Sequence, residues 1–102
     1  MGVLNITPRE RMTDREGRPY FAWDTALTLA EFESRLRDPD PAVRAYFLGK
    51  LMRQARPDDV FAFVTTREIA ERWPDVVPHL GDTRRFWSWL LHAWGALGDD
   101  RG

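Results

Sequence analysis

Prolines and helix-capping residues divide this chain into short segments, and they restrict its fold more than any other feature. The sequence contains seven prolines, and five of them lie between positions 39 and 78. Proline cannot donate a backbone hydrogen bond, and it breaks the interior of a helix or a sheet. Between the prolines, apolar residues recur at every third or fourth position, the period of a helix with one buried face. The sequence therefore predicts several short helices.

Start signals place these helices along the chain. A threonine followed three residues later by a glutamate forms a capping box at Thr28 and again at Thr65. Asp40 before Pro41 combines an N-cap with a proline in the first helical position. We expect helices or helical turns to begin at Thr28, Asp40, Pro57, Thr65 and Asp75, and a last helix to be capped by Asp82 or Thr83.

The predicted fold class is all-α, a compact bundle of five or six short helices in a single domain. Residues 28–97 form the helical domain, residues 98–102 a disordered tail and residues 1–27 an N-terminal arm. Within the arm, Thr7 is expected to cap one helical turn, and residues 20–24 form either one short strand or an irregular segment on the core. The expected core comprises Phe32, Val43, Phe47, Leu51, Ile69, Phe86 and Leu90.

The last helix carries two adjoining apolar stripes and one tryptophan that fits neither. The stripe predicted to face the core comprises Phe86, Leu90, Ala93 and Leu97, and it is flanked by Trp87, Leu91 and Trp94. Trp89 lies about 200° from Trp87 around a helix, so it projects away from the core. Because an exposed tryptophan contributes nothing to stability, we expect the N-terminal arm, a second copy of the chain or a partner to cover Trp89.

The residues near Trp89 favour a partner or a second copy. The chain has five tryptophans, and all but one of its 15 basic residues are arginine. Tryptophan and arginine are the residue types that dominate binding energy at interfaces. Arg84 and Arg85 begin the same helix, where positive charge opposes the helix dipole. We therefore expect a non-enzymatic protein-interaction module that binds through Trp89, Arg84, Arg85 and Trp23.

A basic face provides the alternative function. Lys50, Arg53 and Arg56 follow one another at intervals of three residues, and phosphate groups of a nucleic acid are the ligands such a face would contact. The chain would then be a small nucleic-acid-binding or regulatory protein. The net charge of −1 supplies no overall basic field, which makes this the second choice.

No residue pattern points to catalysis, a metal ion or another cofactor. The two histidines, His79 and His92, are 13 positions apart and belong to no metal-binding motif. The absence of cysteine excludes disulfides and thiolate ligands. There is neither a signal peptide nor an apolar stretch of about 20 residues, so we expect a cytoplasmic protein with no membrane association.

Residues 36–44, with the sequence Leu-Arg-Asp-Pro-Asp-Pro-Ala-Val-Arg, resemble the turn between the two helices of a HEAT-type α-solenoid repeat. The resemblance covers residues 36–52 and implies an antiparallel helical hairpin, in which Arg44 reaches back to a carboxylate of the turn. No second copy of the unit follows, and Tyr46 and Phe47 stand where that family has small residues. The resemblance therefore implies one hairpin and not a repeat array.

Four other segments are similar to a group of short bacterial proteins. They are residues 7–12 (TPRERM), 20–24 (YFAWD), 45–51 (AYFLGKL) and 86–91 (FWSWLL). This similarity implies an antitoxin or accessory protein encoded beside a nucleotidyltransferase-like toxin of the AbiEii type. The usual antitoxin of that system contains a winged-helix DNA-binding domain. This sequence has no winged-helix hairpin, so a repressor role is not implied.

Overall fold

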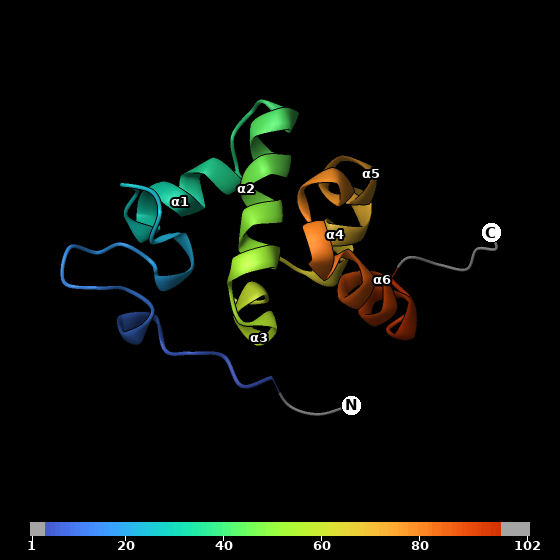
Figure 1. Ribbon diagram of the computed structural model, residues 1–102, viewed down its shortest axis with the longest axis horizontal. Helices are drawn as coiled ribbons and strands as arrows, with labels where there is room; N and C mark the ends of the chain where they lie inside the picture. Colours follow the sequence, from blue (N-terminus) through green and yellow to red (C-terminus); the bar gives the residue numbers. More distant parts are fainter. Residues whose placement is uncertain (1–3, 97–102) are drawn as a thin grey trace.

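Helix α2, Pro41–Gln54, runs through the middle of the molecule, with α1 on one side of it and α4, α5 and α6 on the other (Figure 1). The computed structural model describes residues 4–96, so Leu97 and the predicted tail at 98–102 lie outside the described range. The other α-helices are α1 Leu29–Leu36, α3 Pro57–Val60, α4 Thr66–Glu71, α5 Trp73–Val76 and α6 Arg84–Ala93. The 3-10 helices are η1 Arg9–Arg11, η2 Tyr20–Ala22, η3 Val77–His79 and η4 Gly81–Thr83. Residues 4–96 contain no β-strand, and the all-α prediction is confirmed.

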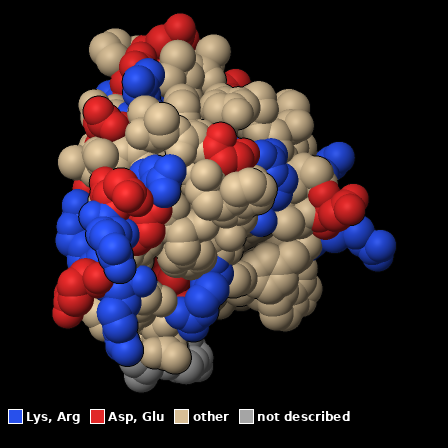
Figure 2. All heavy atoms as spheres, turned by 60° about the vertical axis from the view of Figure 1, so that its left-hand side comes forward, with Lys and Arg blue, Asp and Glu red and all other residues tan. Residues whose placement is uncertain are grey.

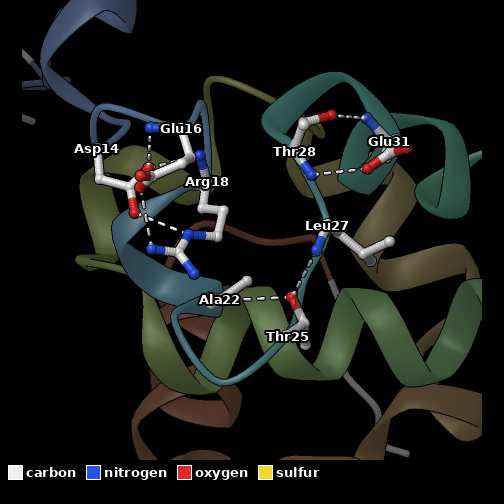
Figure 3. Close-up of polar contacts among 8 residues, drawn as sticks. All are labelled: Asp14, Glu16, Arg18, Ala22, Thr25, Leu27, Thr28 and Glu31. Atoms are coloured by element: carbon white, nitrogen blue, oxygen red, sulfur yellow. Dashed lines mark hydrogen bonds and ion pairs between the residues drawn. The ribbon is translucent and has the colours of Figure 1, made fainter.

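Local capping signals begin the longer helices as predicted. The Thr28 hydroxyl accepts a hydrogen bond from the Glu31 amide at 3.2 Å, and the Glu31 carboxylate accepts one from the Thr28 amide at 2.8 Å (Figure 3). Thr65 and Glu68 form the same capping box at 3.0 and 2.9 Å. The Asp40 carboxylate accepts from an amide in the first turn of α2 at 2.9 Å. Each cap satisfies amides that have no partner inside the helix, which stabilises the helix by about 1 kcal/mol.

Two predicted caps are wrong. The Thr7 hydroxyl does not cap η1 but donates to the Asp59 carboxylate at 2.9 Å. Thr83 precedes α6, but its hydroxyl donates to the Leu80 carbonyl at 2.6 Å and leaves the α6 amides uncapped. Asp82 lies within η4, one position before the N-cap position of α6. The Thr7 hydroxyl oxygen accepts from the Arg56 guanidinium at 2.8 Å, and Thr83 has helical backbone angles where a capping residue has extended ones.

A tight loop shapes the N-terminal arm before α1. The Asp14 carboxylate accepts hydrogen bonds from the amides of Glu16 and Arg18, each at 2.9 Å, and from the Arg18 guanidinium (Figure 3). A carboxylate that accepts from its own following residues replaces the backbone hydrogen bonds of a regular turn. The loop therefore returns the chain towards the core.

The short strand considered for residues 20–24 is wrong, and the irregular alternative is right. A single β-bridge joins Thr13 to Pro19, and the chain then curls into η2. Because Pro19 has no amide hydrogen, it cannot continue a strand ladder. The curl places Phe21 in the core with 1% of its surface exposed.

The core receives a fully buried side chain from the arm and from each α-helix. These side chains are Phe21, Phe32, Leu51, Val60, Ile69, Val76 and Trp87. The predictions for Phe32, Leu51 and Ile69 are confirmed, whereas Val43, Phe47 and Leu90 are only partly buried. The prediction that Phe86 is a core residue is wrong, since 40% of its surface is exposed.

A glycine in the middle of α2 lets η3 approach closely. A Cβ atom added at Gly49 would lie 2.4 Å from the Cβ of His79, a separation that real atoms do not adopt. Glycine in a helix interior costs about 1 kcal/mol relative to alanine. The close packing of η3 on α2 offsets that cost.

Helices α1 and α2 pack against each other across the turn at residues 37–40. The HEAT resemblance implied that Arg44 reaches back to a carboxylate of this turn, but it does not. Its Nη1 donates instead to the carbonyls of Asp38 at 2.8 Å and Pro39 at 3.1 Å. A single helical hairpin occurs in many α-helical folds, so the pairing does not identify a HEAT repeat.

Candidate partner-binding surface

Trp87 fixes the orientation of helix α6. Its indole Nε1 donates to the Met52 carbonyl at 2.9 Å, and the side chain has 1% of its surface exposed. Met52 lies in the last turn of α2, where carbonyls have no partner inside the helix. Leu91, one turn after Trp87, is also buried. The face of α6 that packs on the core therefore contains Trp87 and Leu91, not Phe86 as predicted. A shift of one residue corresponds to a rotation of about 100° around the helix axis.

The opposite face of α6 carries an exposed apolar strip. It consists of Phe86, Trp89 and Ala93, and we call it the α6 strip. The exposed fraction is 64% for Trp89 and 40% for Phe86, and Ala93 is exposed as well. The ring centroids of Phe86 and Trp89 lie 6.2 Å apart. The described part of the N-terminal arm, residues 4–27, therefore leaves Trp89 exposed.

Arg84 and Arg85 stand exposed at the N-terminal end of the α6 strip. Neither guanidinium forms an ion pair with any residue in the range 4–96. By contrast, carboxylates pair with five other arginines: Arg9, Arg18, Arg37, Arg56 and Arg67. The positive end of the helix dipole adds to the two unpaired charges. One end of the strip is therefore distinctly positive.

Trp23, the other predicted contact residue, lies elsewhere on the molecule. It is 72% exposed and directly follows η2. The N-terminal segments lie with α1 on one side of α2, and α6 lies on the other side (Figure 1). All three predicted residues Trp89, Arg84 and Arg85 belong to α6, and Arg85 lies one turn before Trp89 on the same side of the helix, whereas Arg84 points to another side. Trp23 belongs to the segment after η2 and is not part of this helix.

Each residue of the alternative basic face makes an internal contact. Lys50 is only 2% exposed, and its Nζ donates to the Asp24 carboxylate at 2.8 Å. Arg53 donates to the His79 carbonyl at 2.7 Å. Arg56 lies beyond the end of α2 and donates to the N-terminal arm at 2.8 Å. These contacts give the α6 strip the stronger support as a binding surface.

Charges of both signs mix on the α1 side of the molecule. Figure 2 brings this side forward and shows acidic and basic side chains next to one another. The ion pair between Arg9 of η1 and Glu33 of α1 is consistent with this pattern. A nucleic-acid backbone favours cations unopposed by carboxylates, so this side is poorly suited to it.

A buried carboxylate that the sequence analysis missed ties the N-terminal arm to α3. Asp59 is fully buried and accepts from the Thr7 amide at 2.7 Å, the Thr7 hydroxyl at 2.9 Å and the Tyr20 hydroxyl at 2.6 Å. The Arg56 guanidinium lies 3.6 Å away. Thr7 precedes Asp59 by 52 positions, and no spacing rule connects residues so far apart.

The environment of Asp59 keeps both Asp59 and Tyr20 in their usual charge states. Burial on its own would raise the pKa of Asp59, but the hydrogen bonds from Thr7 and Tyr20 and the charge of Arg56 hold it below its ordinary value. Burial, together with the hydrogen bond to Asp59, raises the pKa of Tyr20 to about 12. Neither group titrates near neutral pH, and the arrangement serves as a structural anchor for the arm.

Both histidines make packing contacts. His92 Nδ1 donates to the Ser88 carbonyl at 2.7 Å, and the ring centroids of His79 and Tyr46 lie 5.9 Å apart. Among residues 4–96, no three His, Cys, Asp or Glu side chains are grouped so as to hold a metal ion. A hollow of about 430 Å³ lies between α4 and the end of α6, and Arg67 and Glu71 on its wall pair with each other at 3.3 Å.

Comparisons of the chain with protein-family models, curated proteins and solved structures gave no match. Within the described range, no helix combines the length and the apolar character needed to cross a membrane. Function is therefore inferred here from the geometry of α6.

Proposed function

We propose that this chain is a non-enzymatic protein-interaction module that binds a partner protein through the α6 strip. The observation that carries the proposal is the joint exposure of Phe86 and Trp89 beside two arginines that have no described ion-pair partner. Aromatic side chains and arginine supply most of the binding energy at protein interfaces. The apolar surface that these side chains leave in water contributes nothing to folding.

The opposite face of α6 supports a binding role because it holds the strip in place. The Trp87 hydrogen bond to Met52 and the buried Leu91 fix the helix against the core. A side chain on a fixed helix loses less freedom on binding than one on a mobile loop. The aromatic anchors are thus organised before a partner arrives.

A nucleotidyltransferase-like toxin is the partner to test first, with this chain as its antitoxin or accessory protein. This choice is supported by the similarity of four segments to short bacterial proteins. One of those segments, residues 86–91, contains both Phe86 and Trp89. We further propose a cytoplasmic location for the complex.

Single-stranded nucleic acid is the second candidate partner. Exposed aromatic rings beside arginines also stack on unpaired bases. A protein partner is favoured because the chain carries a net charge of −1. Of the eleven other arginines within residues 4–96, five pair with carboxylates, and Arg44 and Arg53 donate to backbone carbonyls. These contacts reduce the number of cations that could follow a phosphate backbone.

Affinity capture from a host extract, followed by reconstitution with the purified captured protein, tests the proposal. Trp89→Ala should raise the Kd more than about thirtyfold, which corresponds to about 2 kcal/mol. Trp23→Ala is the matched control, because Trp23 is also an exposed tryptophan but follows η2 and is not part of α6. A complex that forms equally well with Trp89→Ala would contradict the proposal.

A further inference from the structure

We propose that the α6 strip inserts as a ridge into an apolar groove of the partner protein, and that acidic side chains rim this groove where it faces Arg84 and Arg85. The inference rests on the proposed function and adds the shape and charge of the partner.

The shape of the strip indicates a groove on the partner. Phe86, Trp89 and Ala93 follow at intervals of three and four residues and span roughly 10 Å along the helix axis. Both aromatic side chains reach solvent, Trp89 with 64% and Phe86 with 40% of its surface exposed. The strip therefore projects from the molecule, and the partner must supply the concave side. Apolar anchors with this spacing on one helix face are the feature that hydrophobic grooves recognise.

The charge of the strip indicates an acidic rim. Arg84 and Arg85 lie together at its N-terminal end, and no carboxylate within residues 4–96 pairs with them. The Thr83 hydroxyl bonds to the Leu80 carbonyl, so no side-chain oxygen caps this end of α6 either. A partner with carboxylates at that position would compensate both guanidinium groups, whereas a basic partner would be repelled.

A second copy of the chain fits this surface less well. The two partly exposed aromatic side chains offer roughly 250 Å² together, whereas a stable interface buries about 800 Å² on each partner. Two ridges placed against each other add little area beyond the aromatic contact. A groove that encloses both flanks of the ridge gains the missing area.

The scarcity of lysine makes a chemical test of the acidic rim available. Lys50 is the only lysine and is 2% exposed, so Arg85→Lys creates the one accessible side-chain amine. Carbodiimide activates a carboxylate, which the amine then attacks to form an amide bond. The N-terminus is acetylated to remove the other amine. Arg15→Lys is the matched control, because Arg15 is also exposed and has no described ion pair.

A photoreactive benzoylphenylalanine in place of Trp89 reports contact independently of charge. Both cross-linking reactions are carried out in host extract, and the linked peptides are identified by mass spectrometry. We expect the amine introduced by Arg85→Lys to form amide bonds with Asp or Glu residues of the partner. These residues should flank the partner segment that is labelled from position 89. The amide yield should exceed that from Arg15→Lys by about tenfold. Combining Arg84→Glu with Arg85→Glu should lower labelling from position 89 by about tenfold. Arg85→Lys and Arg15→Lys keep the positive charge, so each should preserve this labelling.

The outcomes separate this inference from the proposed function. If position 89 labels a protein but Arg85→Lys yields no amide above the control, the acidic rim is wrong and the interaction module stands. Labelling of a second copy of the chain would overturn the groove. If position 89 labels only RNA, or nothing, both the inference and the proposed function fail.

Discussion

Replacing Trp87 tests the orientation of α6, on which the exposure of the α6 strip depends. The side chain is 1% exposed, and its indole donates to the Met52 carbonyl. A tryptophan buries about 150–250 Å², and at about 25 cal/mol per Å² its removal forfeits at most about 4–6 kcal/mol. Core tryptophan replacements by alanine typically cost about 3–5 kcal/mol, and we expect this range for Trp87→Ala.

The neighbouring Phe86 provides the control. Because 40% of its surface is already exposed, Phe86→Ala should cost only about 1 kcal/mol. Urea unfolding followed by far-ultraviolet circular dichroism measures both variants without relying on tryptophan fluorescence. At about 4–8 °C per kcal/mol, the Tm should fall by roughly 12–40 °C for Trp87→Ala. Equal losses of stability for Phe86→Ala and Trp87→Ala would refute the orientation of α6.

Three further predictions concern contacts away from α6. Gly49→Ala should lower the free energy of unfolding by about 1–3 kcal/mol in urea, because its Cβ would overlap that of His79; a gain in stability would contradict the close packing. Asp59, whose pKa is lowered, contributes stability above the ordinary carboxyl pKa of 3.8 and loses it as the pH falls through the lowered pKa. The Tm of Asp59→Asn should therefore depend less on pH below about 4 than that of the wild type, and parallel curves would count against the anchor. Lys50→Met should change the free energy of unfolding by less than about 1 kcal/mol, whereas Asp24→Asn should be more harmful because it leaves a buried ammonium group unpaired; urea titrations showing the reverse order would contradict this.

Signals that act within one helical turn were predictable from the sequence. Thr28, Thr65 and Asp40 cap helices because each side chain and the amides it satisfies lie within three residues. Such short separations leave few competing partners. Thr7 and Thr83 are exceptions: the Thr7 hydroxyl bonds to the distant Asp59 and Arg56, and the Thr83 hydroxyl bonds back to the Leu80 carbonyl.

The orientation of α6 was not predictable in the same way. The pair Phe86 and Leu90 and the pair Trp87 and Leu91 both fit the helical period. The choice between them follows from a hydrogen bond to Met52, which lies 35 positions before Trp87. Sequence spacing contains no information about that carbonyl.

The candidate site was predicted in part. The exposure of Trp89 follows from its position opposite Trp87 once Trp87 faces the core. It does not follow from the predicted inner stripe, because Trp89 lies on the same side of the helix as Phe86 and Ala93. The separation of Trp23 from α6 depends on how the chain passes around α2. The burial of Lys50 depends on Asp24, 26 positions away. Neither fact follows from local pattern.

The binding of the captured partner to Trp89→Ala, measured by titration calorimetry beside the wild type and Trp23→Ala, tests the central claim most directly. We expect Trp89→Ala to raise the Kd more than about thirtyfold while its Tm stays within about 3 °C of the wild type. Trp23→Ala should leave both quantities unchanged. If Trp89→Ala binds like the wild type, or if its Tm falls as far as that of Trp87→Ala, then the α6 strip is not a binding surface.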